Sequence, residues 1–353
     1  MDHLRTRLGA FSAAALLLLS TAACSDADNT EKASSVTSGP ATKTIVAAAN
    51  AFLGKLSGSE KSSVLFARDD KAQKQRWSDL PEGLFERKGL MVGNLDQAKV
   101  DAFLAVMKAT LSAEGYARVM AEWAADDALA GSENGGGGQG MRYGKKYYWI
   151  GIIGEPSESA PWQWQFGGHH VTVNATIKGD DLSLTPSFIG AQPTNYAANG
   201  DAVRPLGDIE DAAFAFVNSL NDADKSKAVL GGTPIDLVLG PGQECRTIRS
   251  EGLPGSGMEA EQQESLIRLI NLYAGLANDE DVVARQAQLR ADLPNTHFAW
   301  YGPTTAGTAA YFRVTGPHLV IEYSPQSMGG DAVEHIHGVY RDPTNDYGGT
   351  VCS

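Results

Sequence analysis

The sequence is poor in basic residues and in cysteine. Its 29 lysines and arginines are outnumbered by 42 aspartates and glutamates, which gives a formal net charge of −13. This balance argues against a nucleic-acid partner, because phosphate binding needs patches of Lys and Arg. The 3 cysteines include no Cys-x-x-Cys pair, so a zinc knuckle is excluded. The chain also lacks the Gly-x-Ser-x-Gly elbow of many serine hydrolases.

The N-terminal segment predicts export. A short basic region precedes an apolar run at residues 13–19, and small residues follow directly before Cys24. This arrangement resembles a bacterial lipoprotein signal, in which the cysteine carries a lipid that anchors the protein to the outer face of a membrane. Cleavage without lipidation is the alternative. We expect a signal peptide (residues 1–23), a disordered polar tether (24–43) and one folded domain (44–353).

Cys245 and Cys352 are the cysteines that remain after the leader. In an exported protein two such residues can form a disulfide. The long loop closed in this way would stabilise the fold by roughly 3–5 kcal/mol. Two free thiols are the alternative, and the sequence leaves both open.

Helical and strand-like patterns come in blocks along the chain. Apolar residues recur with helical spacing at 45–56, 100–111, 207–230 and 266–276, and residues 113–130 are rich in alanine. Aromatic and β-branched residues indicate strands at 147–153, 162–166, 171–177, 297–301, 310–314, 318–323 and 334–340. Because helices and strands do not strictly alternate, we predict an α+β fold with a mostly antiparallel sheet flanked by helices. The sequence shows no evident internal repeat.

The candidate site starts from the pair His335 and His337 near the C-terminal end. Side chains on a strand repeat every two residues, so both imidazoles share one face, as in the beginning of a metal site. Glu322 follows an apolar run, where an acid is costly without a partner. A hairpin between the two strands would place Glu322 opposite these histidines. Histidines that only hydrogen-bond, without a metal, are the alternative interpretation.

His169 and His170 follow two glycines and supply further imidazoles. On a regular strand they point to opposite faces, so only one would join the site unless the glycines distort the strand. His170 is in phase with Thr172 and Asn174, which favours it if the polar face forms the pocket. We predict that these residues bind a divalent transition metal, zinc, iron or copper, and the predicted ligands are His169, His170, His335, His337 and Glu322.

A second polar group lies around the C-terminal motif, and it comprises Arg313, Arg341, Asp342, Asn345 and Asp346. One interpretation is an Asx-type turn in which an Arg–Asp pair fixes the chain end. The other is functional: an arginine holds a substrate carboxylate, and Asp346 orients a ligating histidine.

Several of these motifs together resemble a known family. They are Gly168-His169-His170, the run from Thr185 to Pro193, Arg313 with Gly316-Pro317 and Ile321-Glu322, and His335-Ile336-His337 with the run from Arg341 to Gly348. From about Ile45 onward the chain resembles the bacterial and fungal family called domain of unknown function 3500. The resemblance implies no established activity.

The residues support three hypotheses about function. The first is an exported, membrane-tethered, metal-dependent enzyme, either a hydrolase or an oxygen-using enzyme. The second is a lipoprotein that binds or delivers a metal without turnover. The third is a metal-free module that binds a small molecule through tryptophans such as Trp162 and Trp164, which share a strand face; packing within the sheet is the structural alternative for them.

Overall fold

The computed structural model describes residues 39–132, 140–328 and 330–352. The predicted signal peptide, Cys24 and most of the predicted tether lie outside these residues. Helix α1 begins at Pro40, inside the predicted tether, and proline suits this position because its missing N–H would have no partner there. Within the described ranges, no helix combines the length and the apolar character needed to cross a membrane.

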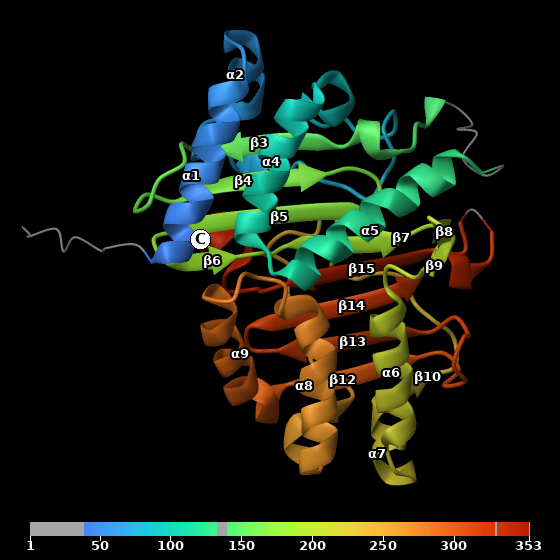
Figure 1. The fold of residues 1–353 in the computed structure, drawn as a ribbon. Helices are drawn as coiled ribbons and strands as arrows, with labels where there is room; N and C mark the ends of the chain where they lie inside the picture. Colours follow the sequence, from blue (N-terminus) through green and yellow to red (C-terminus); the bar gives the residue numbers. More distant parts are fainter. Residues whose placement is uncertain (1–38, 133–139, 329, 353) are drawn as a thin grey trace, which may run out of the picture. The chain divides into compact units, whose positions relative to one another are not determined.

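The predicted α+β fold with a mostly antiparallel sheet is confirmed (Figure 1). The order of the main strands is β1 (Leu65–Phe66), β3 (Trp149–Ile153), β4 (Trp162–Gly167), β5 (Val171–Lys178), β7 (Ser187–Ala191), β15 (Ile336–Arg341), β14 (Leu319–Pro325), β13 (Tyr311–Gly316), β12 (His297–Tyr301) and β10 (Val229–Gly231). Short strands β2 (Leu90–Met91), β6 (Asp181–Ser183) and β11 (Leu253–Pro254) join β3, β5 and β12, and β8 (Tyr196–Ala198) pairs with β9 (Asp201–Val203).

The helices form two groups along the chain, and each group packs against one half of the sheet. The first group is α1 (Pro40–Lys55), α2 (Gly58–Val64), the short α3 (Lys71–Lys74), α4 (Gln97–Thr110) and α5 (Ala113–Ala130). The second group is α6 (Gly207–Ser219), α7 (Asp222–Ala228), α8 (Ala260–Ala274) and α9 (Asp281–Asp292). Several helices begin where a side chain accepts a bond from a free backbone N–H, as Asp96 does for α4 and Ser112 for α5.

The sheet contains an internal duplication. The first half, from α1 to β7, and the second half, from α6 to β15, share one order of elements: two helices, a short strand parallel to its neighbour in the sheet, a short antiparallel strand, two more helices and then the remaining antiparallel strands. Within the described residues, the short helix α3 has no counterpart in the second half. Strands β7 and β15 pair with each other at the centre. The sequence shows no repeat because what recurs is strand pairing and element order rather than a short motif.

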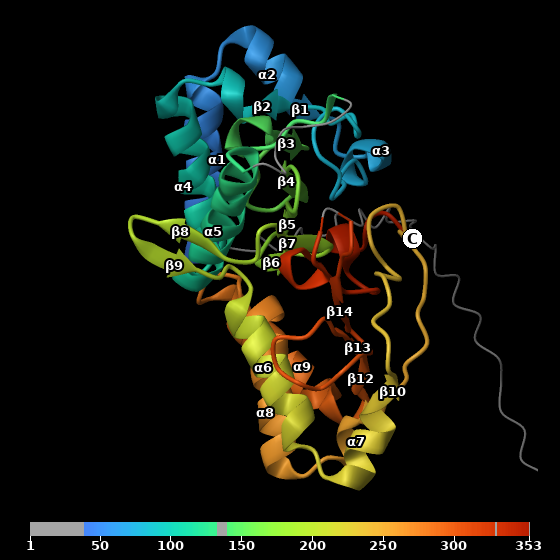
Figure 2. The ribbon, with the colours of Figure 1, turned by 90° about the vertical axis from the view of Figure 1, so that its right-hand side faces the viewer.

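The two faces of the sheet differ in what covers them (Figures 1 and 2). Long helices such as α5 and α8 cover one face, and on β15 the side chains of Ile336 and Tyr340 belong to the core on this side. Val339 alternates to the opposite face, where it packs with Trp77 and Phe188. Because side chains alternate along a strand, His337 shares the face of Val339, which loops and the chain end cover.

Candidate metal centre

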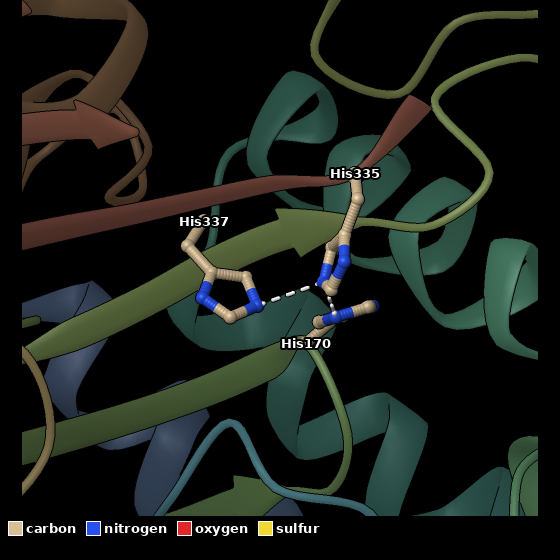
Figure 3. A group of neighbouring side chains, drawn as sticks. All are labelled: His170, His335 and His337. Atoms are coloured by element: carbon tan, nitrogen blue, oxygen red, sulfur yellow. Dashed lines mark hydrogen bonds between the residues drawn. The ribbon is translucent and has the colours of Figure 1, made fainter. Parts of the chain in front are cut away.

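Three histidines from distant parts of the chain meet at one point (Figure 3). His335 directly precedes β15, His337 lies within it, and His170 lies in the turn before β5. The Nε2 atom of His335 is 2.9 Å from Nε2 of His170 and 3.0 Å from Nε2 of His337. The sheet order causes this meeting, because only β7 separates β5 from β15. The structure thus brings together three of the four predicted histidine ligands.

The turn before β5 is distorted in the way that the glycines suggested. His170 has a φ of 68°, in the left-handed region that residues other than glycine rarely adopt. As a result, His169 and His170 do not point to opposite faces, and their ring centroids lie 3.5 Å apart with an angle of 32° between the planes. A Cβ atom on Gly168 would lie 2.6 Å from the Tyr148 ring, so glycine is required there.

A second glycine lets the turn approach β15. Gly190 of β7 pairs with His337, and β7 lies between the turn that carries His170 and the strand β15. A Cβ atom at this position would lie 2.8 Å from the carbonyl oxygen of Ile336 and 3.2 Å from that of His170. Any side chain here would therefore push the two groups of imidazoles apart.

The hydrogen bonds around the triad leave lone pairs that face one another. Nδ1 of His335 lies 2.7 Å from the carbonyl oxygen of Met328, so this nitrogen carries the proton and Nε2 carries a lone pair. Nδ1 of His337 lies 3.4 Å from a carboxylate oxygen of Asp79, which favours the same tautomer. The Nε2 atoms of His335 and His337 are then both acceptors, so neither can donate a hydrogen bond to the other. A cation between the rings would resolve this arrangement.

Burial keeps these imidazoles neutral. It lowers the pKa of His335 to about 4, and it holds the pKa values of His170 and His337 well below the ordinary 6.5. Neighbouring histidines add to the effect for His170 and His337, because a charged ring would repel a second one. Neutral imidazole is the form that binds a metal, so the protonation state of the triad is compatible with metal binding at neutral pH.

The distances from Nε2 of His335 to the other two Nε2 atoms fit ligands of one transition-metal ion. With metal–nitrogen bonds of about 2.05 Å, two ligand atoms lie about 2.9 Å apart at a right angle and about 3.3 Å apart at a tetrahedral angle. The contacts of 2.9 and 3.0 Å require little movement of the rings. His170, His335 and His337 form a group of three without an acidic member among the described residues, so the ion would keep an open position.

His169 packs against the ring of His170 and is itself held by Asp126. Its Nδ1 lies 2.7 Å from Oδ1 of Asp126 on α5, and the other oxygen of Asp126 accepts the backbone N–H of Gly144 at 2.9 Å. Asp126, His169 and His170 form a second group that could hold an ion. Nδ1 of His169 is already engaged by Asp126, however, and its ring packs against that of His170. We assign to His169 the role of fixing the ring of His170.

Sequence reasoning missed Asp126 and Asp79. Asp126 lies in an alanine-rich helix, and Asp79 lies in the loop after α3; no local pattern connects either residue to a histidine far along the chain. Burial raises the pKa of Asp79. Only the packing of α5 and of this loop against the sheet reveals the two contacts.

Glu322 does not lie at the centre, so we leave it out of the ligand set. The predicted hairpin of β14 and β15 forms, but its register places Ser324 opposite His337 and Val339 opposite Glu322. Both oxygens of Glu322 are engaged elsewhere: Oε1 accepts the Tyr311 hydroxyl at 2.6 Å, and Oε2 accepts the backbone N–H of Leu239 at 2.7 Å. These bonds explain how an acid lies fully buried in an apolar strand.

The predicted polar group also lies away from the triad. Arg341 donates to the carbonyl oxygens of Leu239 and Gly240 and to Asp346, while Arg313 pairs with Glu251. Asp342 accepts from Arg285 at 2.7 Å, and the backbone oxygen of Asn345 accepts from Ser183 at 2.9 Å. These contacts support the structural interpretation, in which an Arg–Asp pair holds the chain end.

Cys245 and Cys352 are paired. They form a disulfide with Cα atoms 5.3 Å apart, which ties the loop that contains Glu244 to the chain end. The same loop is held by Arg341, so the covalent bond and the ion pairs act on one region.

The tryptophans proposed for ligand binding are packing residues. Trp162 and Trp164 are 1% and 0% exposed, and both belong to the core of the first half. Trp164 donates its indole N–H to the hydroxyl of Thr110. Neither ring is free to stack on a ligand.

The fold and this site define an α+β protein with a candidate three-histidine metal centre. Residues 38–349 match the model of the family described as Protein of unknown function (DUF3500), so the chain belongs to this family and the resemblance is confirmed. No curated protein and no solved structure matches the chain.

Proposed function

We propose that the protein is an exported metal-binding protein in which His170, His335 and His337 hold one divalent transition-metal ion. The observation that carries the proposal is the convergence of three Nε2 atoms, with contacts of 2.9 and 3.0 Å, from two distant segments. A carbonyl oxygen and a carboxylate at two of the outer nitrogens add support, because ligating histidines are usually held in this way. Three imidazoles suit zinc, copper or iron.

We extend this proposal to a metal-dependent enzyme, a hydrolase or an oxygen-using one. Structural zinc sites are closed by four protein ligands, whereas catalytic sites keep three and an open position. A bound ion would supply Lewis acidity or a site for oxygen. The protein's part is to hold the ligands: Met328 orients His335, Asp79 orients His337, and His169 orients His170.

Export is supported by two independent features. The disulfide between Cys245 and Cys352 is typical of proteins outside the reducing cytosol. The leader pattern before Cys24 resembles that of a lipid-anchored bacterial protein, which would attach this domain to the outer face of a membrane.

A protein that binds or delivers a metal without turnover is the second candidate. It is favoured by the exposure of the segment that holds one ligand. His335 is held by the backbone of Met328, a residue that is 77% exposed, so movement of this residue would release one ligand.

Metal analysis of the protein without an affinity tag tests the proposal. After loading with zinc, copper or iron and removal of free ions, we expect about one equivalent in the parent and a large loss in His170→Ala, His335→Ala and His337→Ala. His297→Ala on β12 is the matched control and should retain its metal. Less than about a tenth of an equivalent in the parent, or equal content in all four variants, refutes the proposal.

A chelator separates the two candidates. An enzyme should keep its ion for many minutes against a competing chelator, and a delivery protein should release it within seconds to an acceptor. Hydrolysis of ester or phosphoester probes that depends on the loaded metal, and disappears in His337→Ala, would establish turnover.

A further inference from the structure

A second candidate site lies in the first half of the sheet, on the face away from the long helices. It is a cavity of about 230 Å³, and its lining includes Arg68, Lys71, Lys74, Gln163, Thr176 and Thr350. Three of these side chains are cations and only one acid, Asp69, also borders the space. This local excess of positive charge is unusual in a chain with a formal charge of −13.

The ammonium group of Lys74, a buried residue, forms no ion pair among the described residues. Its residue is 6% exposed, yet its ammonium group donates only to a neutral partner, the hydroxyl of Thr350 at 2.9 Å. The ammonium group of Lys71 donates to the carbonyl oxygen of Val351 at 3.0 Å. Within residues 39–132, 140–328 and 330–352, neither lysine nor Arg68 forms an ion pair. A buried charge without a counter-charge is costly.

The pKa of Lys74 is lowered, because burial and the neighbouring charge of Lys71 disfavour its charged form more than the nearby carboxylates of Asp69 and Asp70 favour it. Each ammonium group has three N–H donors, and one of them is engaged in each lysine. The remaining donors, with the guanidinium of Arg68, can serve an acceptor that carries negative charge.

We propose that this cavity binds a small molecule through an oxyanion, either a phosphate or a carboxylate group. An oxyanion offers several acceptor atoms and full charge, so it would neutralise the lysines and use the donors left over. A volume of about 230 Å³ suits a small metabolite rather than a polymer.

The site is separate from the histidine triad. Thr176 lies six residues beyond His170 along β5, which corresponds to roughly 20 Å at about 3.3 Å per residue. No residue of the cavity lining belongs to the triad. The proposal therefore stands or falls independently of the metal.

Calorimetry on protein freed of metal with EDTA tests the proposal at neutral pH. The probes are inorganic phosphate and malonate, and we expect one site per chain. Binding of phosphate alone, malonate alone or both would support the proposal and identify the preferred oxyanion. No heat and no thermal stabilisation with either probe at roughly 10 mM would overturn it.

Substitutions locate the site. Lys71 and Arg68 are exposed, so Lys71→Met and Arg68→Met should leave the fold intact, and each should weaken binding by about tenfold or more. Lys74→Met should abolish binding, with near-ultraviolet circular dichroism as the check on folding. Lys55→Met removes an exposed lysine on α1 and should bind like the parent. Equal affinity in Lys71→Met, Arg68→Met and Lys55→Met would refute the assignment.

Discussion

The Nδ1 atom of His318 lies 2.6 Å from Oδ2 of Asp292, in the turn between β13 and β14. This contact repeats the one between His169 and Asp126, at 2.7 Å, in the equivalent turn of the first half. Among the described residues, no group of three potential metal ligands includes His318. The Asp–His contact is therefore a feature of the turn in both halves, whereas the histidine triad combines His170 of the first half with His335 and His337 of the second.

The two contacts should differ in their effect on stability. The side chain of Asp126 is 1% exposed and serves two donors, whereas that of Asp292 is 19% exposed. We expect Asp126→Ala to lower the free energy of unfolding by about 1–3 kcal/mol, because buried donors lose their acceptor. Asp292→Ala should lower it by about 1 kcal/mol or less and leave the metal content unchanged. Urea denaturation measures both, and equal losses would contradict the interpretation.

Gly190 should control metal binding without touching the metal. In Gly190→Ala the new methyl group would collide with the carbonyl oxygen of Ile336, 2.8 Å from the Cβ position. Strands β7 and β15 or the His170 turn must then shift, so the metal affinity should fall about 10- to 100-fold. The control is Gly54→Ala on α1, where a Cβ atom meets nothing within 4 Å. Competition with a fluorescent zinc chelator compares the two; unchanged affinity in Gly190→Ala would show that the strand spacing is not critical.

The low pKa of His335 predicts an acid-sensitive fold in the metal-free protein. Burial lowers this pKa to about 4, below the ordinary value of 6.5 that applies when the chain is unfolded. Between these values the unfolded chain binds a proton that the folded protein does not. Stability is thus complete above pH 6.5 and falls as the pH drops toward 4.

Replacing His335 tests whether its imidazole causes this loss of stability at low pH. His335→Gln should reduce the pH dependence of the unfolding free energy between pH 6 and 5 by about 1.4 kcal/mol per pH unit, the effect of one proton. His297→Gln on β12 serves as the control. Urea denaturation at several pH values gives the slope, and the same slope in the parent and in His335→Gln would show that this imidazole titrates normally.

The sequence predicts the parts of the centre that depend on local geometry. The spacing of His335 and His337 places them on one face, and the glycines before His170 allow the turn that redirects it. Glu322 was placed wrongly because the long connection at 326–335 does not fix the register of the hairpin as a two-residue turn would. Asp79 and Asp126 reach the site through packing between distant segments, which no local pattern encodes. The duplication leaves no sequence repeat for a related reason: equivalent turns carry His169-His170 in one half and Pro317-His318 in the other. The histidine that contacts an aspartate is the first of these two residues in one half and the second in the other.

Glu122 on α5 is a buried acid that should weaken the fold at high pH. It is 0% exposed, and neither of its carboxylate oxygens has a hydrogen-bond partner among the described residues. Burial raises its pKa well above the usual range; the charge of Arg118 opposes this rise and that of Asp208 adds to it. Above the ordinary pKa of a glutamate the unfolded chain releases a proton that the folded protein retains. Stability therefore falls as the pH rises from about 4.5, until the folded pKa is reached.

Glu122→Gln isolates this effect, because glutamine has the shape of the protonated acid and does not titrate. The variant and the parent should be similarly stable at pH 4, and the variant should gain about 1.4 kcal/mol relative to the parent for each pH unit above the ordinary pKa. Glu86→Gln replaces an exposed acid and should show no such trend. Thermal and urea unfolding between pH 4 and 8 provide the comparison. A constant difference between Glu122→Gln and the parent over this range would mean that the carboxyl group ionises in the folded protein as readily as in the unfolded chain.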